Sequence, residues 1–260
     1  MKEILRVENL KKIYRSGNTI GEVSFSLHEG EFLGLIGESG CGKSTLARLI
    51  CGLLQKTSGT IYYRGQNLEN YSAEEKRKTL RNIQMIFQSP YSSLNPRFRI
   101  KDTLAEGFFR SQLLSKKESG EEEMISLLHE VGLKADILEN YPHQLSGGQC
   151  QRVAIARALA ANPEMIIADE SLSALDMLTQ CQIIDLFEKI KKERKLSCLF
   201  ISHDLFIVRN ICDRVLIMKE GKIIEEGKKE EIFEAPKKEY TQFLLEASIQ
   251  FLYEKDKKRI

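Results

Sequence analysis

The chain has 260 residues, 42% of them hydrophobic and 29% charged, so it can bury a core and is not a disordered tail protein. Its 39 lysines and arginines nearly balance 37 aspartates and glutamates, which argues against nucleic-acid binding through bulk positive charge. No apolar run approaches the roughly 20 residues of a membrane-spanning helix, and we expect neither secretion nor a span. The six cysteines lack metal-binding spacing, so reduced thiols are expected.

The first predicted elements are short strands interrupted by one glycine loop. Strand patterns occur at residues 4–10, 23–27, 32–36 and 83–87. The run 32–36 is wholly apolar, as in a strand buried on both faces. Glycines follow it at 37, 40 and 42, and a helical pattern begins at Lys43. The order is therefore strand, glycine loop and helix.

Helical patterns replace strands from Pro90 to about Pro163, near 100–115, 121–131 and 147–161. Further strands are predicted at 165–168, 197–201 and 214–218, and further helices at 177–194, 204–212 and 239–253, the last with Phe243 on its apolar side. The alternation predicts an α/β fold with a mainly parallel sheet and an antiparallel N-terminal part. We expect a core of 1–89 and 163–235, an inserted α-helical subdomain of 90–162 that carries a second glycine segment, and a C-terminal helix with a charged tail at 236–260.

The glycine loop fits the pattern of a phosphate-binding loop, Gly-x-x-x-x-Gly-Lys-Ser, beginning at Gly37. Glycines let backbone N–H groups turn toward phosphate oxygens, Lys43 can reach the outer phosphates, and the Ser44 hydroxyl can ligate Mg²⁺. Because a strand precedes it and a helix follows, we interpret it as a nucleotide site rather than a tight turn. The residues of this predicted nucleotide-binding loop are Gly37, Glu38, Ser39, Gly40, Cys41, Gly42, Lys43, Ser44 and Thr45.

Four polar residues follow other predicted strands. Asp169 ends one of them and can hold Mg²⁺, while Glu170 can polarise an attacking water. Gln88 follows the strand at 83–87, where its amide can contact Mg²⁺ and that water. His203 follows the strand at 197–201 and can reach a terminal phosphate. By position alone, a solvated glutamine fits Gln88 equally well, and a lone histidine such as His203 is more often structural.

Leu145-Ser-Gly-Gly-Gln149, the signature segment, precedes a helical pattern. Ser146 in the cap position and two glycines make a second anion-binding helix N-terminus. This site has no lysine of its own. It therefore indicates half of a composite site that closes over a nucleotide held by another subunit.

These segments, in this order and with Ser173-Ala-Leu-Asp176, resemble the nucleotide-binding subunit of ATP-binding cassette (ABC) transporters over about residues 3–235. The resemblance implies a P-loop NTPase (RecA-like) core that hydrolyses ATP with Mg²⁺, and two subunits that sandwich two ATP molecules head to tail. It implies that Tyr14 stacks on adenine, Glu170 is the general base, and His203 assists at the γ-phosphate. It also implies a magnesium site made by Ser44, Gln88 and Asp169.

By the same resemblance, ATP of the other subunit is bound by Ser146, Gly147, Gly148 and Gln149, and Asp176 belongs to the loop that links the two sites. One position departs from the family pattern, because Ser171 stands where proline is usual. Proline fixes φ at this turn, so serine can loosen the turn, but it removes no catalytic group. Cys41 and Cys150 are open to two interpretations, a redox switch on ATP binding or small residues at tolerant positions.

Residues 88–97 and 236–245 resemble the peptide and nickel importer subfamily. The segment 82–88 and the absence of cysteine after Cys212 favour the nickel-type subunit, although nickel, metal chelates, dipeptides and oligopeptides all remain possible solutes. The implied partners are a second ATP-binding subunit, two transmembrane permease subunits and an extracytoplasmic solute-binding protein, with no nucleic acid. The chain would be peripheral, at the cytoplasmic face of the cell membrane.

Two alternatives remain. An exporter would use an ATPase with the same motifs. A cassette ATPase of DNA repair or translation typically needs a long coiled-coil insertion or two cassettes in one chain, and neither fits in 260 residues.

Overall fold

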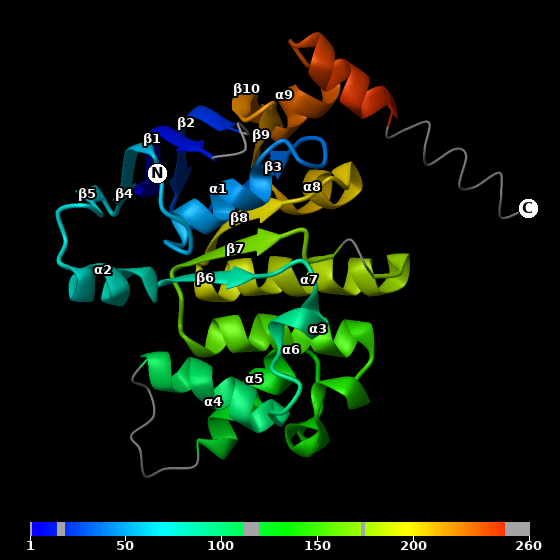
Figure 1. The fold of residues 1–260 in the computed structure, drawn as a ribbon. Helices are drawn as coiled ribbons and strands as arrows, with labels where there is room; N and C mark the ends of the chain where they lie inside the picture. The colour runs from blue at the N-terminus through cyan, green and yellow to red at the C-terminus, as the bar shows by residue number, and fades with distance from the viewer. Residues whose placement is uncertain (1, 15–18, 112–119, 173–174, 248–260) are drawn as a thin grey trace, which may run out of the picture. The chain divides into compact units, whose positions relative to one another are not determined.

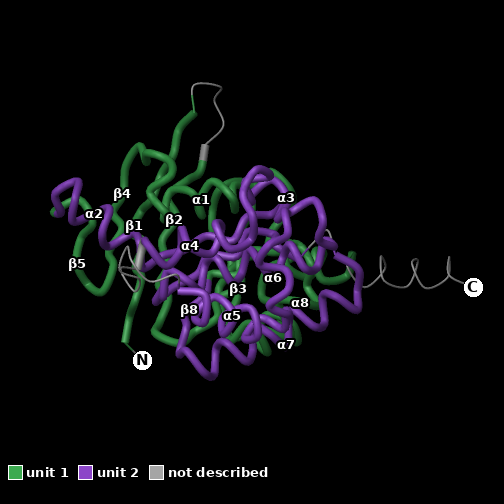
Figure 2. The backbone as a smooth tube through the Cα atoms, turned by 90° about the horizontal axis from the view of Figure 1, so that it is seen from below, with its two compact units in different colours: residues 1–70, 199–260 green, residues 71–198 purple. Residues whose placement is uncertain are grey.

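A computed structural model of the chain describes residues 2–14, 19–111, 120–172 and 175–247 (Figure 1). The chain divides into two compact units, which Figure 2 colours separately. Unit 1 comprises residues 1–70 and 199–260, and unit 2 comprises residues 71–198. Within the described ranges, no helix has both the length and the apolar character needed to cross a membrane.

Unit 1 contains an antiparallel sheet with the strand order β2-β1-β4-β5. Its strands are β1 (Glu3–Ile13), β2 (Thr19–His28), β4 (Ser58–Tyr63) and β5 (Gln66–Asn67). Val7 of β1 lies opposite Phe25 on one side and Ile61 on the other, and all three side chains are buried. The early antiparallel part predicted from the sequence is thus present, with two strands, β4 and β5, that the sequence patterns did not indicate.

The second sheet segment of unit 1 carries the glycine loop. β3 (Phe32–Ile36) is fully buried and pairs in parallel with β9 (Arg214–Lys219), which pairs antiparallel with β10 (Lys222–Lys228). β8 (Ser197–Ile201), along which the chain passes from unit 2 into unit 1, is the other neighbour of β3. The described residues of unit 1 include the helices α1 (Lys43–Ile50), α8 (Leu205–Ile211) and α9 (Lys229–Glu234).

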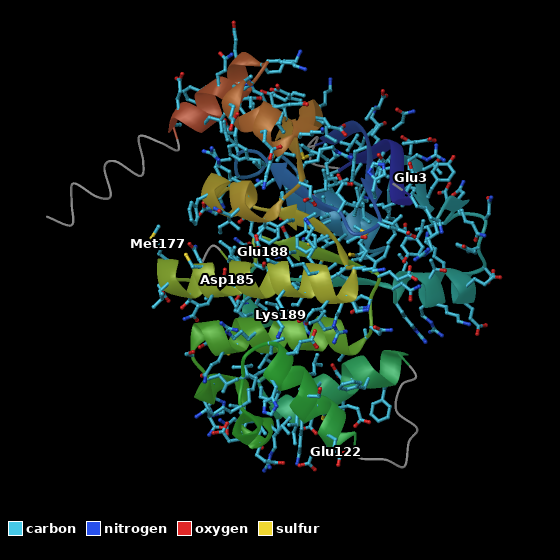
Figure 3. The ribbon with its side chains drawn as sticks, turned by 180° about the vertical axis from the view of Figure 1, so that it is seen from behind. Glu3, Glu122, Met177, Asp185, Glu188 and Lys189 are labelled. Carbon is cyan, nitrogen blue, oxygen red and sulfur yellow. The ribbon has the colours of Figure 1, made fainter. Side chains whose placement is uncertain are left out.

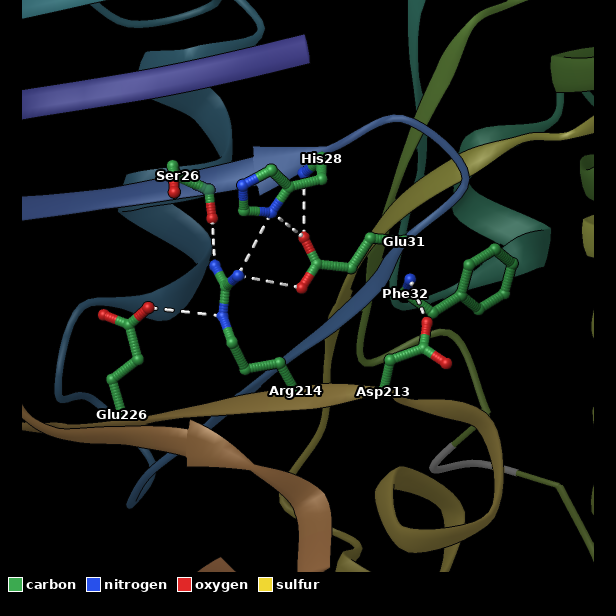
Figure 4. A network of polar contacts seen from close by, with 7 residues as sticks. All are labelled: Ser26, His28, Glu31, Phe32, Asp213, Arg214 and Glu226. Carbon is green, nitrogen blue, oxygen red and sulfur yellow. Dashed lines mark hydrogen bonds and ion pairs between the residues drawn. The ribbon is translucent and has the colours of Figure 1, made fainter. Parts of the chain in front are cut away.

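A polar network fixes the approach to β3 (Figure 4). Arg214, at the start of β9, forms ion pairs with Glu31 at 3.0 Å and with Glu226 at 3.2 Å, and donates to the Ser26 carbonyl. Glu31 is 5% exposed and also accepts from the His28 backbone N–H at 2.8 Å. Because a buried carboxylate is costly unless it is paired, this network defines the turn that leads into β3.

The C-terminal helix of unit 1, residues 239–247 within the described range, is anchored by Glu225 of β10. The Glu225 carboxylate accepts hydrogen bonds from the Lys237 backbone N–H at 2.7 Å and from the Thr241 hydroxyl. Thr241 is therefore fully buried, whereas Phe243 is 64% exposed. The prediction that Phe243 lies on the buried side was wrong, because the polar anchor turns the Thr241 side of the helix inward.

In unit 2, β6 (Ile83–Ile86) pairs in parallel with β7 (Met165–Asp169), and Ile86 lies opposite Ala168. Its helices are α2 (Ala73–Leu80), α3 (Pro90–Ser93), α4 (Ile100–Ser111), α5 (Glu121–Glu130), η1 (Ala135–Glu139), η2 (Pro142–Gln144), α6 (Gly147–Ala160) and α7 (Met177–Arg194). α6 packs against α3, α4 and α5. The predicted subdomain 90–162 lies inside unit 2, and its exact limits stay a prediction.

Helix α7 is amphipathic, with one buried side and one exposed side. Ile183, Phe187 and Ile190 are fully buried at helical spacing. Charged side chains occupy the exposed side, among them Asp185, Glu188 and Lys189 (Figure 3). The predicted helix 177–194 is confirmed at both ends, because a single amphipathic period runs through it.

Candidate nucleotide-binding and catalytic site

The phosphate loop, Gly37–Thr45, joins β3 to α1 in unit 1. A Cβ atom added at Gly37 would lie 2.2 Å from the backbone oxygen of Met218, so no side chain fits there. Gly42 is the N-cap of α1 and has φ 113°, a left-handed conformation that favours glycine. The loop thus turns directly into the N-terminus of α1, and a helix N-terminus is the end that binds phosphate.

Lys43 is held on this loop. Its Nζ donates to the backbone oxygens of Gly37 and Glu38, each at 2.8 Å, and the residue is only 4% exposed. The loop thus closes around its own ammonium group. The positive charge is fixed beside the N–H groups at the start of α1, where the predicted role of Lys43 requires it.

Two other predicted residues of unit 1 lie close to the phosphate loop. The Tyr14 hydroxyl is 3.4 Å from Thr45 Oγ1, at the end of the loop. His203 is exposed and follows Ser202, whose N–H donates to the Leu35 oxygen of β3 at 3.3 Å. Both side chains therefore belong to the surroundings of the loop, and their roles toward adenine and the γ-phosphate stay predictions.

Unit 2 brings together Gln88 and Glu170. β6 and β7 run in parallel, so the residues that follow them lie at the same edge. Gln88 Nε2 donates to Glu170 Oε2 at 2.8 Å. Glu170 has φ 45°, a conformation uncommon for a residue with a side chain, and the surrounding structure must hold it there. The preceding Asp169 is 4% exposed.

The predicted magnesium ligands have suitable chemistry. A serine hydroxyl, an aspartate carboxylate and a glutamine amide oxygen are hard donors of the kind that Mg²⁺ takes. Gln88, which uses Nε2 on Glu170, keeps Oε1 as a donor oxygen. No group of three or more His, Cys, Asp or Glu side chains within the described ranges could hold a metal ion.

The signature segment forms the N-terminus of α6. Ser146 Oγ accepts from the Gln149 N–H at 3.3 Å, and Gln149 Oε1 accepts from the Ser146 N–H at 2.9 Å, which is a capping box. A Cβ at Gly148 would lie 2.8 Å from Thr179 Cγ2, so this glycine allows close packing against α7. Ser146 itself is exposed, as recognition of a group from another molecule requires.

Asp176 is the N-cap of α7. Its carboxylate accepts from the Thr179 N–H at 3.0 Å and from the Thr179 hydroxyl at 2.6 Å. The side-chain bond and then the backbone bond lower the pKa of Asp176. Ser173 and Ala174 of the same predicted loop lie outside the described residues.

Ser171, in the position where the family usually has proline, is 2% exposed. Its hydroxyl has no hydrogen-bond partner within the part of the chain that the structure describes. The serine therefore contributes a buried polar atom without a compensating bond at the residue next to Glu170.

Of the two cysteines considered for redox control, Cys150 is buried and Cys41 is partly exposed. Burial is the main cause that raises the pKa of both the Cys41 and the Cys150 thiol. Cys150 is fully buried and donates to the Pro142 oxygen at 3.4 Å. Because the thiolate is the reactive form, these environments favour the interpretation of both cysteines as packing residues.

Comparison with known proteins identifies the class. Residues 20–173 match a family model described as ABC transporter, and the chain belongs to this family. The predicted fold class, the family and the assignment as an ATPase of a transporter are thereby confirmed.

Two relatives of this chain are ATP-binding proteins of peptide transport. The chain is 46% identical over 254 residues to the oligopeptide transport ATP-binding protein AppF of Bacillus subtilis, covering 93% of this chain and 77% of the relative. It is 42% identical over 255 residues to the dipeptide transport ATP-binding protein DppF of Escherichia coli, covering 94% and 76%. Neither relative is named for nickel, so the preference for the nickel-type subunit gains no support from them.

Two solved structures from ABC transporters have a fold similar to that of this chain. One of cbiO1 from Clostridium perfringens, described as part of the ABC transporter complex cbiONQ, has a TM-score of 0.79 and 29% identity, covering 90% of this chain and 92% of that one. A dimeric structure of the ATP-binding cassette MJ0796 bound to ADP and Pi has a TM-score of 0.76 and 32% identity, covering 87% and 99%.

Proposed function

We propose that the chain hydrolyses ATP as the ATP-binding subunit of an importer for oligopeptides or dipeptides. Within the structure, the proposal is supported most directly by the phosphate loop closed on Lys43 at the start of α1. The peptide specificity is supported by the names of AppF and DppF and by their identity with this chain.

Each unit carries part of the expected machinery. In unit 1 the phosphate loop and Lys43 would bind the phosphates, with Ser44 as a Mg²⁺ ligand and His203 at the γ-phosphate. In unit 2 Asp169 and Gln88 would supply further oxygen ligands. Mg²⁺, when bound, would neutralise charge on the phosphate oxygens. Glu170 would take the proton of the attacking water, and its orientation is fixed by Gln88.

The exposed signature segment, with no lysine beside it, supports action in pairs. We propose that Ser146, Gly147, Gly148 and Gln149 bind ATP held by a second ATP-binding subunit, and that Asp176 lies in the loop between the two sites. Tyr14 would stack on adenine. The solved dimer of a related cassette bound to ADP and Pi supports this arrangement.

The remaining partners follow from the importer assignment. They are two transmembrane permease subunits and an extracytoplasmic solute-binding protein. The chain would then be peripheral, at the cytoplasmic face of the cell membrane. Binding of ATP would favour the closed pair and hydrolysis the open pair, a population shift that the permease subunits convert into transport.

Two substitutions in the full-length chain test the ATPase. We expect Lys43→Ala to abolish binding of a fluorescent ATP analogue, because it removes the ammonium group from the phosphate loop. We expect Glu170→Gln to bind ATP normally, to lose turnover by about a thousandfold for a lost general base, and to accumulate ATP-dependent dimers. The control is Glu164→Gln, just before the opposite end of β7. Wild-type turnover in Glu170→Gln would refute the assigned base.

Uptake measurements test the solute. Cells that lack the chain should lose uptake of a labelled dipeptide or oligopeptide and recover it with the wild-type chain but not with Lys43→Ala. Uptake of labelled nickel should be unaffected. Loss of nickel uptake with normal peptide uptake would replace the peptide assignment by nickel.

A further inference from the structure

The short helix α3 lies between the Gln88–Glu170 pair and the signature segment. It begins two residues after Gln88, where Ser89 caps it by accepting from the Ser92 N–H at 3.4 Å. Pro90 occupies its first position and is buried. Since proline restricts φ and the cap fixes the first turn, a displacement of Gln88 is transmitted to α3 over a short, stiff stretch of chain.

The Tyr91 side chain extends from α3 to the signature segment. Its hydroxyl donates to the Leu145 oxygen at 2.8 Å, a contact between residues 54 positions apart. Leu145 is 5% exposed and directly precedes Ser146. Tyr91 is 47% exposed, so it contributes little to the core, and its hydroxyl also contacts the Cys150 thiol of α6.

A second contact joins α3 to α6, the helix that begins in the signature segment. Arg157 of α6 donates from Nη1 to the Ser93 oxygen at 2.5 Å, at the last residue of α3. Tyr91 and Arg157 therefore attach α3 to α6 at two points, near the start of α6 and three turns further on. These two attachments and the packing of α3 on α6 restrict how far α3 can shift relative to α6.

We propose that Tyr91 is a positioning residue that couples the Gln88–Glu170 pair to the signature segment of the same chain. The connection has three steps. Glu170 is bonded to Gln88, the stiff segment from Gln88 carries Tyr91, and Tyr91 holds the carbonyl next to Ser146. This inference rests on the proposed function, in which Ser146 contacts ATP held by a second subunit.

The coupling would link the catalytic residues of one ATP site to the signature segment that completes the other site. When Gln88 moves with Glu170 and its water, Tyr91 shifts the start of α6. This shift also moves the signature segment that would contact the second ATP. Each subunit's catalytic carboxylate would in this way influence the closure of the site that it completes in its partner. Without the Tyr91 hydroxyl, the connection would depend on the Arg157 contact alone and would be weaker.

Tyr91→Phe in the full-length chain removes only the hydroxyl. We expect the free energy of unfolding to fall by no more than about 1 kcal/mol, and binding of a fluorescent ATP analogue by the monomer to be unchanged. We expect ATP turnover (kcat) and ATP-dependent dimer formation in the Glu170→Gln background to fall about tenfold, the effect of one hydrogen bond. Tyr141→Phe is the matched control, since the Tyr141 hydroxyl lies 3.5 Å from Arg99 Nε in the same unit and not on this connection.

A double-mutant cycle separates coupling from simple structural support. If Tyr91 acts through Gln88, the kcat of Gln88→Ala with Tyr91→Phe will be no lower than that of the more affected single variant. Multiplicative losses in the double variant, or wild-type kcat and dimer formation in Tyr91→Phe, would overturn the inference. Ser146→Ala identifies which proposal fails. If Ser146→Ala is also wild type in dimer formation, the proposed function is wrong as well, whereas a defect there leaves only the Tyr91 coupling refuted.

Discussion

Gln88 Nε2 lies 2.8 Å from Glu170 Oε2, joining the residues that follow two neighbouring parallel strands. The bond holds one oxygen of the Glu170 carboxylate in a defined position at the end of β7. It also supports a backbone that has φ 45° at Glu170. The amide therefore orients the predicted base rather than acting on the proton itself.

Gln88→Ala should lower kcat by about tenfold, because a hydrogen bond to a charged group contributes about 1.5 kcal/mol. ATP affinity should change little, since the phosphate loop lies in other elements of the chain. Steady-state ATPase assays with direct binding measurements provide the test. The control is Gln84→Ala on the same strand, where Nε2 donates to the Arg81 oxygen at 2.7 Å. Equal effects of the two substitutions would show that Gln88 has no special role.

Gly37→Ala should disrupt the phosphate loop, because the new Cβ would lie 2.2 Å from a backbone oxygen that cannot rotate away. We expect a loss of stability of about 1–3 kcal/mol and ATP binding at least about tenfold weaker. Gly34→Ala in β3 is the control, with its Cβ 2.6 Å from the Val208 side chain. Both variants should unfold at lower urea concentration, and only Gly37→Ala should lose affinity. Normal ATP affinity in Gly37→Ala would contradict the assigned loop geometry.

Sequence patterns predicted some elements well and missed others for physical reasons. β3 and β8 were predicted with their exact bounds, because both are uninterrupted apolar strands. β10 was missed because its sequence is mostly polar, and its place comes from pairing with β9. α2 was also missed, although Ser72 and Glu75 form a capping box that the sequence does contain.

In the candidate site, too, some residues could be predicted from the sequence and others could not. The phosphate loop and the signature segment are local motifs, so their residues could be named without a structure. The contact from Tyr91 to Leu145 joins positions far apart in the sequence and had no local signal. The cap at Ser89-Pro90 indicates that a helix begins there, and only the fold determines what that helix contacts.

Ser171→Ala should stabilise the chain by about 1 kcal/mol, because it removes a buried hydroxyl that lacks a partner among the described residues. Ser202→Ala gives the opposite case. Ser202 is 4% exposed and its Oγ accepts from the Asp204 N–H at 2.9 Å, so its loss should cost about 1 kcal/mol. Urea unfolding of both variants measures the difference. Equal destabilisation would mean that the Ser171 hydroxyl is satisfied in solution.

Glu225→Ala should release the C-terminal helix, because this carboxylate binds both the Lys237 N–H and the Thr241 hydroxyl. Trypsin cleavage after Lys237 should become about tenfold faster, as the local opening free energy falls by about 1–2 kcal/mol. Glu239→Ala, at an exposed position of the same segment, is the control and should leave the cleavage rate unchanged. An unaltered rate in Glu225→Ala would show that other contacts hold the helix.

The cap of α7 should make stability depend on acid pH. Hydrogen bonds from Thr179 lower the pKa of Asp176 below its ordinary value, so the folded chain favours the carboxylate. The stabilisation is complete above the unfolded pKa of about 3.9 and is lost as the pH falls through the lower folded value. Asp176→Asn keeps a capping oxygen without a titrating charge, so its unfolding free energy should decline less between pH 5 and pH 2. Asp185→Asn, on the exposed side of the same helix, serves as the control in denaturation followed by circular dichroism. A decline in Asp176→Asn identical to that of the wild type would exclude this carboxylate as the source.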